Sequence, residues 1–385
     1  MAVVAGDWLS RDATQAVCRM LTDAGYLAYF VGGCVRDALL GLPVGDVDIC
    51  TDARPATIQD LAGKAGLKAI PTGIDHGTIT VVSDGIPHEV TTFRRDVETD
   101  GRRAVVAFSS SIEEDARRRD FTMNALYADP QGQVLDPLGG MADLKARRLR
   151  FIEDADLRIR EDYLRILRFF RFHARFGDPE AGLDPEALNA IASNAEGLET
   201  LSAERVGSEM TRLLGGADPA PAMAAMQQTG ALVHVLPGAN PAPLAPLIHV
   251  ERLVGLAPDW GARLAALGGE DTAERLRLSR KDTARLMLFR EEVGSARGPG
   301  ALGYLYGATE AAHILTLRVV LLEQPFDAQL FQEAREGATA TFPLSARDLM
   351  PAYEGAALGQ RLAVLKDRWI GSGFTLDRAA LLREE

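Results

Sequence analysis

The sequence predicts an α/β domain over residues 1–150, followed by an all-helical region that continues to residue 385. Two observations predict this division. Short β-like runs alternate with helical segments in the first part, at 28–31, 47–50, 78–82, 88–93, 104–108 and 125–128. Beyond residue 150, Leu-, Ala- and Arg-rich segments with helical periodicity follow one another, separated by Gly/Pro breaks at 176–179, 215–221, 237–246 and 298–300.

Two adjacent glycines, Gly32 and Gly33, follow the first predicted strand, which ends at Val31. They break the strand, and residues 35–40 then read as a short helix that carries Arg36. Glycine amides and an arginine side chain are both suited to binding phosphate oxygens. Alone, such a pair of glycines usually marks only a turn.

A second strand returns from this helix and carries Asp46 and Asp48. Because side chains alternate along a strand, the two carboxylates are expected on the same face. Two like charges there repel unless a cation lies between them, and oxygen ligands suit Mg²⁺. Alone, a D-x-D pair usually lies in a solvated loop. The ordered combination of glycine turn, helix and paired aspartates predicts a nucleotidyl-transfer site.

Glu89 stands among apolar and β-branched residues of the predicted strand at 88–93. It is either a third acid near the metal or a paired glutamate of an edge strand, and the sequence leaves both interpretations open.

A triple arginine, Arg117 to Arg119, stands directly before the apolar run at 121–128. This position places at least one guanidinium group at the mouth of the sheet, where it can bind phosphate oxygens in a forked geometry. Asp120 is expected to hold an arginine in position.

Charged residues recur every three positions, at Asp162, Arg165, Arg168 and Arg171, in an otherwise apolar helix predicted over 161–172. Such a helix is expected to be buried, and buried arginines need anionic or carbonyl partners. Internal ion pairs such as Glu161–Arg165 are one explanation. Three arginines against two acids leave an excess that a ligand would satisfy.

The net charge of −12 argues against a broadly basic nucleic-acid surface, but the charges are unevenly distributed. Residues 145–175 hold ten Lys and Arg against five Asp and Glu. A focused basic cleft of this kind can steer a polyanion to an acidic protein. Three cysteines make neither a disulfide framework nor a zinc site and favour the reducing cytoplasm, and no apolar run is long enough to span a membrane.

Together these motifs resemble the class II CCA-adding enzyme and bacterial poly(A) polymerase family, within the polymerase-beta-like nucleotidyltransferases. The resemblance runs from about residue 30 to residue 214 and includes the Glu-Arg-Val-Gly-Ser-Glu block at 204–209. It implies a nucleotidyltransferase head with a small mixed sheet and helices over 1–150, a helical neck with base recognition over 151–225, and an RNA-binding body and tail over 226–385. Carried over by position, the resemblance implies Mg²⁺ at Asp46 and Asp48, and nucleotide contacts at Gly33, Arg36, Arg119, Asp162, Arg165, Arg168 and Arg171.

The family resemblance implies template-independent addition of CCA to tRNA 3′ ends from CTP and ATP, by two-metal nucleotidyl transfer that releases pyrophosphate. We expect no association with a membrane, and the resemblance does not imply a protein partner. Cytosine and adenine both present an amino donor beside a ring-nitrogen acceptor, so Asp162 and Arg165 would complement both bases and reject uracil and guanine. The segment at 71–78 resembles the CCA-adding pattern, and the arginine-rich stretch typical of bacterial poly(A) polymerases is absent. A-only or C-only addition, poly(A) synthesis and a non-catalytic RNA-binding role remain alternatives.

Overall fold

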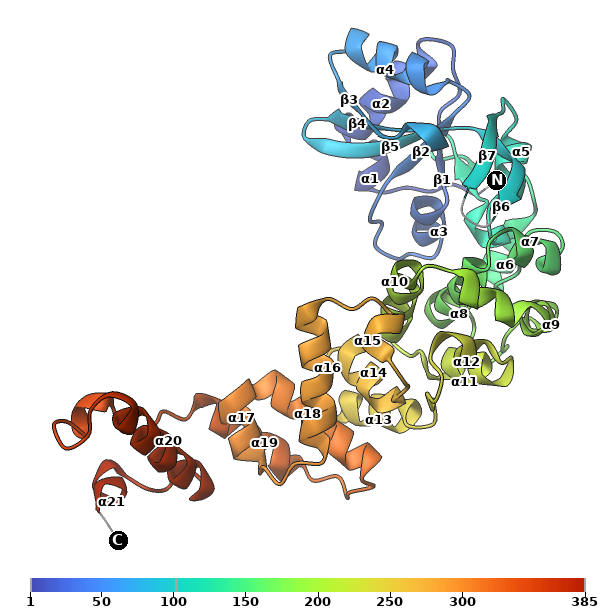
Figure 1. Ribbon diagram of the computed structural model, residues 1–385. Coiled ribbons are helices and arrows are strands. Elements are labelled where there is room, and N and C mark those ends of the chain that lie inside the picture. Colours follow the sequence, from blue (N-terminus) through green and yellow to red (C-terminus); the bar gives the residue numbers. More distant parts are fainter. Residues whose placement is uncertain (1, 101–102, 384–385) are drawn as a thin grey trace. The chain divides into compact units, whose positions relative to one another are not determined.

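A computed structural model of the chain describes residues 2–100 and 103–383 and divides into two compact units (Figure 1). The first unit comprises residues 1–206 and 225–235, and the second comprises residues 207–224 and 236–385. The division at residues 150 and 225 that the family resemblance implies stays a prediction. No helix in the described part of the chain is both long enough and apolar enough to cross a membrane.

A seven-stranded mixed sheet forms the centre of the first unit, in the order β3-β4-β5-β2-β1-β8-β9. Only β2 and β5 are parallel; the other neighbours in this sheet are antiparallel. A two-stranded ribbon, β6-β7, stands apart from it. The strands are β1 (Tyr29–Val31), β2 (Asp48–Thr51), β3 (Lys68–Gly73), β4 (Thr78–Ser83), β5 (Ile86–Thr92), β6 (Arg94–Asp100), β7 (Arg103–Phe108), β8 (Tyr127–Ala128) and β9 (Val134–Leu135). The predicted small mixed sheet is confirmed.

Helices surround the sheet and then replace it after residue 135. Before the last strand they are α1 (Asp7–Ser10), α2 (Asp12–Thr22), α3 (Gly33–Leu39), α4 (Pro55–Lys64) and α5 (Ile112–Arg117), with 3₁₀ turns η1 (Ile74–His76) and η2 (Thr122–Asn124). After it come α6 (Gly140–Lys145), α7 (Ala155–Glu161), α8 (Leu164–Phe176), α9 (Pro185–Asn194), η3 (Ala195–Thr200) and α12 (Ala231–Val235). Helices α10 (Ala203–Leu214) and α11 (Ala220–Gln228) contribute residues to both units.

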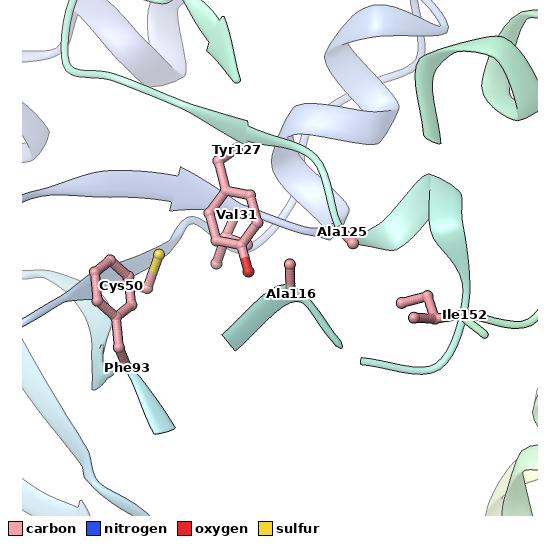
Figure 2. Packing of buried hydrophobic residues seen from close by; sticks show 7 residues of the cluster. All are labelled: Val31, Cys50, Phe93, Ala116, Ala125, Tyr127 and Ile152. Atoms are coloured by element: carbon pink, nitrogen blue, oxygen red, sulfur yellow. The ribbon is translucent and has the colours of Figure 1, made fainter. Parts of the chain in front are cut away.

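The two faces of the sheet have different neighbours. Helices α2 and α4 pack against β4 and β5 (Figure 1), and Thr14 of α2 hydrogen-bonds His88 of β5 across 3.0 Å. Since side chains alternate, Asp48, Cys50 and Glu89 project from the opposite face. That second face also carries Val31 and Tyr127, which pair across β1 and β8 and belong to one buried cluster (Figure 2).

Two predicted elements differ from the structure in their boundaries. The strand expected to carry both aspartates begins only at Asp48, so Asp46 lies two residues before it. The helix expected from Glu161 onward is interrupted, because Asp162 is extended (φ −155°, ψ 104°) and α8 begins at Leu164. The Asp162 carboxylate accepts the Leu164 N–H at 3.1 Å, which satisfies a free donor of the new helix.

The second unit is helical. Its elements are α13 (Leu244–Val254), α14 (Trp260–Leu267), α15 (Thr272–Arg275), α16 (Arg280–Val293), α17 (Pro299–Tyr306), α18 (Ala308–Leu321), α19 (Ala328–Thr339), η4 (Ala346–Asp348), α20 (Gly355–Gly371) and α21 (Arg378–Leu382). Helices α17 and α19 approach closely because glycines face each other; a Cβ added to Gly303 would lie 1.9 Å from the Ala334 carbonyl oxygen. The all-helical region predicted beyond residue 150 is confirmed.

Candidate active site

The glycine turn joins β1 to α3 as the sequence predicts. Gly32 has φ +71°, a conformation that side chains rarely adopt, and it precedes the first residue of α3, Gly33. A Cβ on Gly32 would lie 3.5 Å from Nη1 of Arg119, and one on Gly33 would lie 3.8 Å from Nη2 of Arg36. The turn therefore brings two of the predicted phosphate-binding arginines next to the first residue of α3, Gly33.

Two carboxylates lie on the second face of the sheet, and Asp46 precedes the strand that carries one of them. Asp48 of β2 is paired in register with Glu89 of β5, so the two side chains share a face at neighbouring strand positions. Burial, and then the charges of Glu89 and Asp46, raise the pKa of Asp48 to about 6, although Arg119 opposes them. The charges of Asp46, Glu89 and Arg119 therefore all act on the Asp48 carboxylate.

Glu89 lies in an interior strand, because β5 has β4 on one side and β2 on the other. The interpretation as an edge-strand glutamate is therefore wrong. Its side chain is exposed and forms no salt bridge with any residue of 2–100 or 103–383. Its catalytic role stays a prediction.

Arg119 is fixed by side chains from α5 and β8. Its Nη2 donates to Asp115 at 2.9 Å and its Nε donates to the Tyr127 hydroxyl at 3.1 Å. Burial lowers the pKa of Arg119, but the Asp115 carboxylate outweighs it and the net shift is upward. The guanidinium group is thus a permanent positive charge beside Asp48.

Arg36 and Arg168 are joined through two polar side chains. Arg36 donates to Asn124 at 2.6 Å, Asn124 donates to Asp120 at 3.0 Å, and Arg168 donates to the other Asp120 oxygen at 2.8 Å. Burial would raise the pKa of Asp120, but Arg168 and the hydrogen bonds lower it to about 2. Asp120 holds an arginine in position, as the sequence predicts, and the arginine is Arg168.

Aromatic rings of α8 support the same arginines. The Arg36 guanidinium carbon lies 3.9 Å from the centroid of the Phe176 ring. Those of Arg168 and Arg171 lie 5.2 Å and 4.4 Å from the centroid of Phe172. Such cation–π contacts hold a guanidinium group in one orientation.

Asp162 and Arg165 each have a partner within the first unit. Asp162 accepts from Arg205 of α10 at 2.7 Å, and Arg165 donates to Glu161 at 2.6 Å. The predicted Glu161–Arg165 ion pair is confirmed. Arg165 also donates to the carbonyl oxygens of Arg158, at 2.7 Å, and Arg118, at 3.3 Å. The bond to Arg118 connects Arg165, which is predicted to read the base, to the residue next to Arg119.

Four residues of this site had no assigned role in the sequence. They are Asp115, Asn124, Tyr127 and Arg205. The i,i+4 spacing of Asp115 and Arg119 was a usable signal for one of them. The other three act through side-chain contacts between separate elements.

Two stretches of the chain match known protein families. Residues 28–150 match the poly A polymerase head domain, and residues 182–242 match the probable RNA and SrmB-binding site of polymerase A. Over 404 aligned residues the chain is 34% identical to the mitochondrial CCA tRNA nucleotidyltransferase 1 of Mus musculus, covering 97% of this chain and 90% of the mouse protein. The chain belongs to the CCA-adding enzyme family. It is therefore a nucleotidyltransferase, as the motifs predict.

Two further CCA-adding enzymes match 58% and 94% of the chain. That of Geobacillus thermodenitrificans is 44% identical over 224 residues, which span 58% of this chain but only 54% of the relative. The solved structure of the Bacillus stearothermophilus CCA-adding enzyme in complex with CTP superposes with a TM-score of 0.74 at 30% identity, covering 94% of this chain and 92% of that one. The predicted family and fold class are thereby confirmed.

Proposed function

We propose that this protein adds CCA to the 3′ ends of tRNA from CTP and ATP. The observation that carries the proposal is the convergence of Asp48, Arg119 and the Gly32 turn on one face of the sheet. Relatives that match over nearly the whole chain are named CCA tRNA nucleotidyltransferases, and a similar solved structure is a complex with CTP. In the reaction, the 3′ oxygen of the RNA forms a bond to the α-phosphorus while the bond to pyrophosphate breaks.

The family implies a divalent metal, and the residues present fit one. Asp46 lies two residues before Asp48, and the pKa of Asp48 is raised first by burial and then by the negative charges of Glu89 and Asp46. Within residues 2–100 and 103–383 no three His, Cys, Asp or Glu side chains form a ready-made cage. Mg²⁺ is commonly held by one or two carboxylates plus substrate phosphates, so Asp46 and Asp48 would hold it together with the bound nucleotide. When bound, Mg²⁺ would activate the 3′-hydroxyl and neutralise triphosphate charge.

Glu89 completes the proposed catalytic set because its charge acts on Asp48 from the neighbouring strand position. In this proposal the Gly33 amide binds the triphosphate together with Arg36, Arg119, Arg168 and Arg171. The Gly32 N–H donates to the Leu126 carbonyl at 3.2 Å, so Gly32 contributes the shape of the turn. Their anchoring by Asp115, Asp120 and aromatic rings supports it, since preorganised cations stabilise developing charge without rearrangement.

The base would be read by Asp162 and Arg165. Each carboxylate oxygen of Asp162 accepts one protein hydrogen bond, from Leu164 or Arg205, and each retains a lone pair for an exocyclic amino group. Arg165 can donate to the adjacent ring nitrogen. Uracil and guanine present the reverse order of donor and acceptor, so they would leave polar groups unpaired.

We expect Arg165→Ala to lose discrimination between CTP and UTP by roughly 100-fold or more. The variant removes the donor that cytosine needs and uracil rejects. Relative kcat/KM for CTP and UTP with tRNA ending in the discriminator base is the measurement. Arg160→Ala is the matched control, because Arg160 is an exposed arginine of α7 paired only with Asp156 and Asn194 among the described residues. Unchanged selectivity in Arg165→Ala would count against base reading by this residue.

One assay tests the function itself. A tRNA lacking its terminal trinucleotide is offered labelled CTP and ATP, separately and together, with Mg²⁺. Addition of C, C and A that then stops supports the proposal. Open-ended A addition would indicate a poly(A) polymerase, and addition of one nucleotide type alone would indicate an A-only or C-only enzyme. Cell fractionation tests the cytoplasmic location that the cysteine content favours.

A further inference from the structure

We infer that Tyr127 is a positioning residue whose hydroxyl group, together with Asp115, holds Arg119 at the triphosphate subsite. The inference deepens the proposed function and rests on it, because that function makes Arg119 a phosphate ligand. Tyr127 belongs to β8 and Asp115 to α5, so two separate elements meet on one guanidinium group.

The hydrogen bonds form a closed triangle. Tyr127 donates its hydroxyl proton to Oδ2 of Asp115 at 2.8 Å, and the same hydroxyl oxygen accepts from Nε of Arg119 at 3.1 Å. Arg119 closes the triangle by donating from Nη2 to Oδ2 of Asp115 at 2.9 Å. Arg118 neutralises the other carboxylate oxygen, donating to Oδ1 at 2.8 Å. Nε and Nη2 of Arg119 thereby both donate to side chains of the protein.

Burial gives these bonds their strength. Asp115 and Tyr127 are fully buried, whereas the Arg119 side chain keeps 18% of its surface exposed. Burial alone would raise the pKa of Asp115, but Arg119, Arg118 and the Tyr127 hydroxyl together lower it below its usual range. Asp115 is therefore ionised at neutral pH, and its charge pairs with the arginines rather than with solvent.

The register of the sheet places the Tyr127 side chain on the active face. Tyr127 pairs with Val31 of β1, and Cys50, next to β1 on β2, has the same orientation as Asp48 two residues earlier. Figure 2 shows the Tyr127 ring packed in this cluster with its hydroxyl directed toward Ala116, the neighbour of Asp115. Among the described residues of the cluster, Tyr127 is the one whose side chain is hydrogen-bonded to Arg119.

The third nitrogen of the Arg119 guanidinium group, Nη1, lies beside the glycine turn. No residue in the described part of the chain accepts a hydrogen bond from Nη1 of Arg119, which lies 3.5 Å from the position of a Cβ on Gly32. The triangle therefore aims Nη1 at the glycine turn, where the phosphates would bind. Because the triphosphate is common to CTP and ATP, loss of the Tyr127 hydroxyl should weaken both substrates equally.

The test compares Tyr127→Phe with Tyr29→Phe. Both changes delete one hydroxyl and keep the ring in the same cluster, but no described residue is hydrogen-bonded to the Tyr29 hydroxyl. For Tyr127→Phe we expect KM for CTP and for ATP to rise together by roughly tenfold, with kcat within threefold and CTP/UTP selectivity unchanged. Inhibition by inorganic tripolyphosphate should weaken by the same factor. Tyr29→Phe should behave as wild type.

Action through Arg119 is tested in a double variant. In an Arg119→Ala background, adding Tyr127→Phe should change tripolyphosphate binding, measured by calorimetry, by less than twofold. If Tyr127→Phe weakened tripolyphosphate binding equally in the wild-type and Arg119→Ala backgrounds, the inference would be overturned. Wild-type KM values in Tyr127→Phe would overturn it as well. If Tyr127→Phe proves unfolded, Asp115→Asn must give the same KM pattern. Calorimetry needs no turnover, so a wild-type protein that binds tripolyphosphate but extends no RNA refutes the proposed function and leaves the inference standing.

Discussion

Asp48→Asn abolishes nucleotide incorporation, with a fall in kcat/KM of at least about 10³-fold expected from loss of a metal-holding carboxylate. The amide is isosteric with the carboxylate but carries no charge to hold a divalent ion between Asp46 and the substrate. The measurement is incorporation of labelled CTP into tRNA lacking its last three nucleotides. Asp84→Asn is the matched control, because Asp84 occupies the exposed β4–β5 turn with φ +49°, a conformation that asparagine accepts.

The same substitution is expected to stabilise the metal-free protein. Asp48 is half-buried and lies beside Glu89, and its pKa is raised to about 6. A carboxylate whose pKa rises on folding opposes folding when it is ionised, so above pH 6 the wild-type protein carries a penalty that asparagine removes. The thermal midpoint of Asp48→Asn in EDTA at pH 7.5 should rise by roughly 2 °C. A variant that both melts earlier and loses activity would contradict the metal assignment, since global damage would explain it.

The hydrophobic pattern predicted those strands and helices whose buried side chains recur at regular spacing. The strands at 28–31 and 88–93 and the helix after Gly33 were found close to their predicted positions. Three strands escaped prediction: β3, β6 and β9. β3 is an edge strand with Pro71, β6 is mostly charged and pairs only with β7, and β9 is two residues long. Their pairing depends on partners distant in sequence, which a local pattern does not reveal.

The sequence predicted the residues that would bind metal or phosphate better than it predicted the residues that hold them in place. Asp48, Arg119 and the glycine turn could be named because phosphate and metal chemistry demands those residue types in that order. Two residues that hold these groups in place could not be named, because their partners are distant in sequence: Arg205 bonds Asp162 across 43 positions, and Asn124 bonds Arg36 across 88. The break before α8 was also missed, because a capping side chain such as Asp162 interrupts a helix without changing the apolar pattern.

A buried ion pair in the second unit carries the largest expected effect on stability. Arg263 of α14 and Glu251 of α13 are 1% and 2% exposed, and the guanidinium Nη2 lies 2.7 Å from the Glu251 carboxylate. Arg263 also donates to the carbonyl oxygens of Leu214, at 2.7 Å, and Gly216. Removal of the Glu251 charge leaves the buried Arg263 without its ionic partner. Glu251→Gln should therefore lower the free energy of unfolding by about 3–5 kcal/mol and the thermal midpoint by roughly 10 °C.

The neighbouring residue provides the control. Arg252 follows Glu251 on α13 but pairs with Asp218 at the surface, with 62% and 43% of the two side chains exposed. Arg252→Gln should therefore change stability by less than about 1 kcal/mol. The double variant Glu251→Leu/Arg263→Met removes both charges and should recover part of the loss. Recovery stays incomplete because the Leu214 and Gly216 carbonyls lose their donor, at about 1–3 kcal/mol each. Equal midpoints for Glu251→Gln and Arg252→Gln would show that the buried pair contributes no more than a surface one.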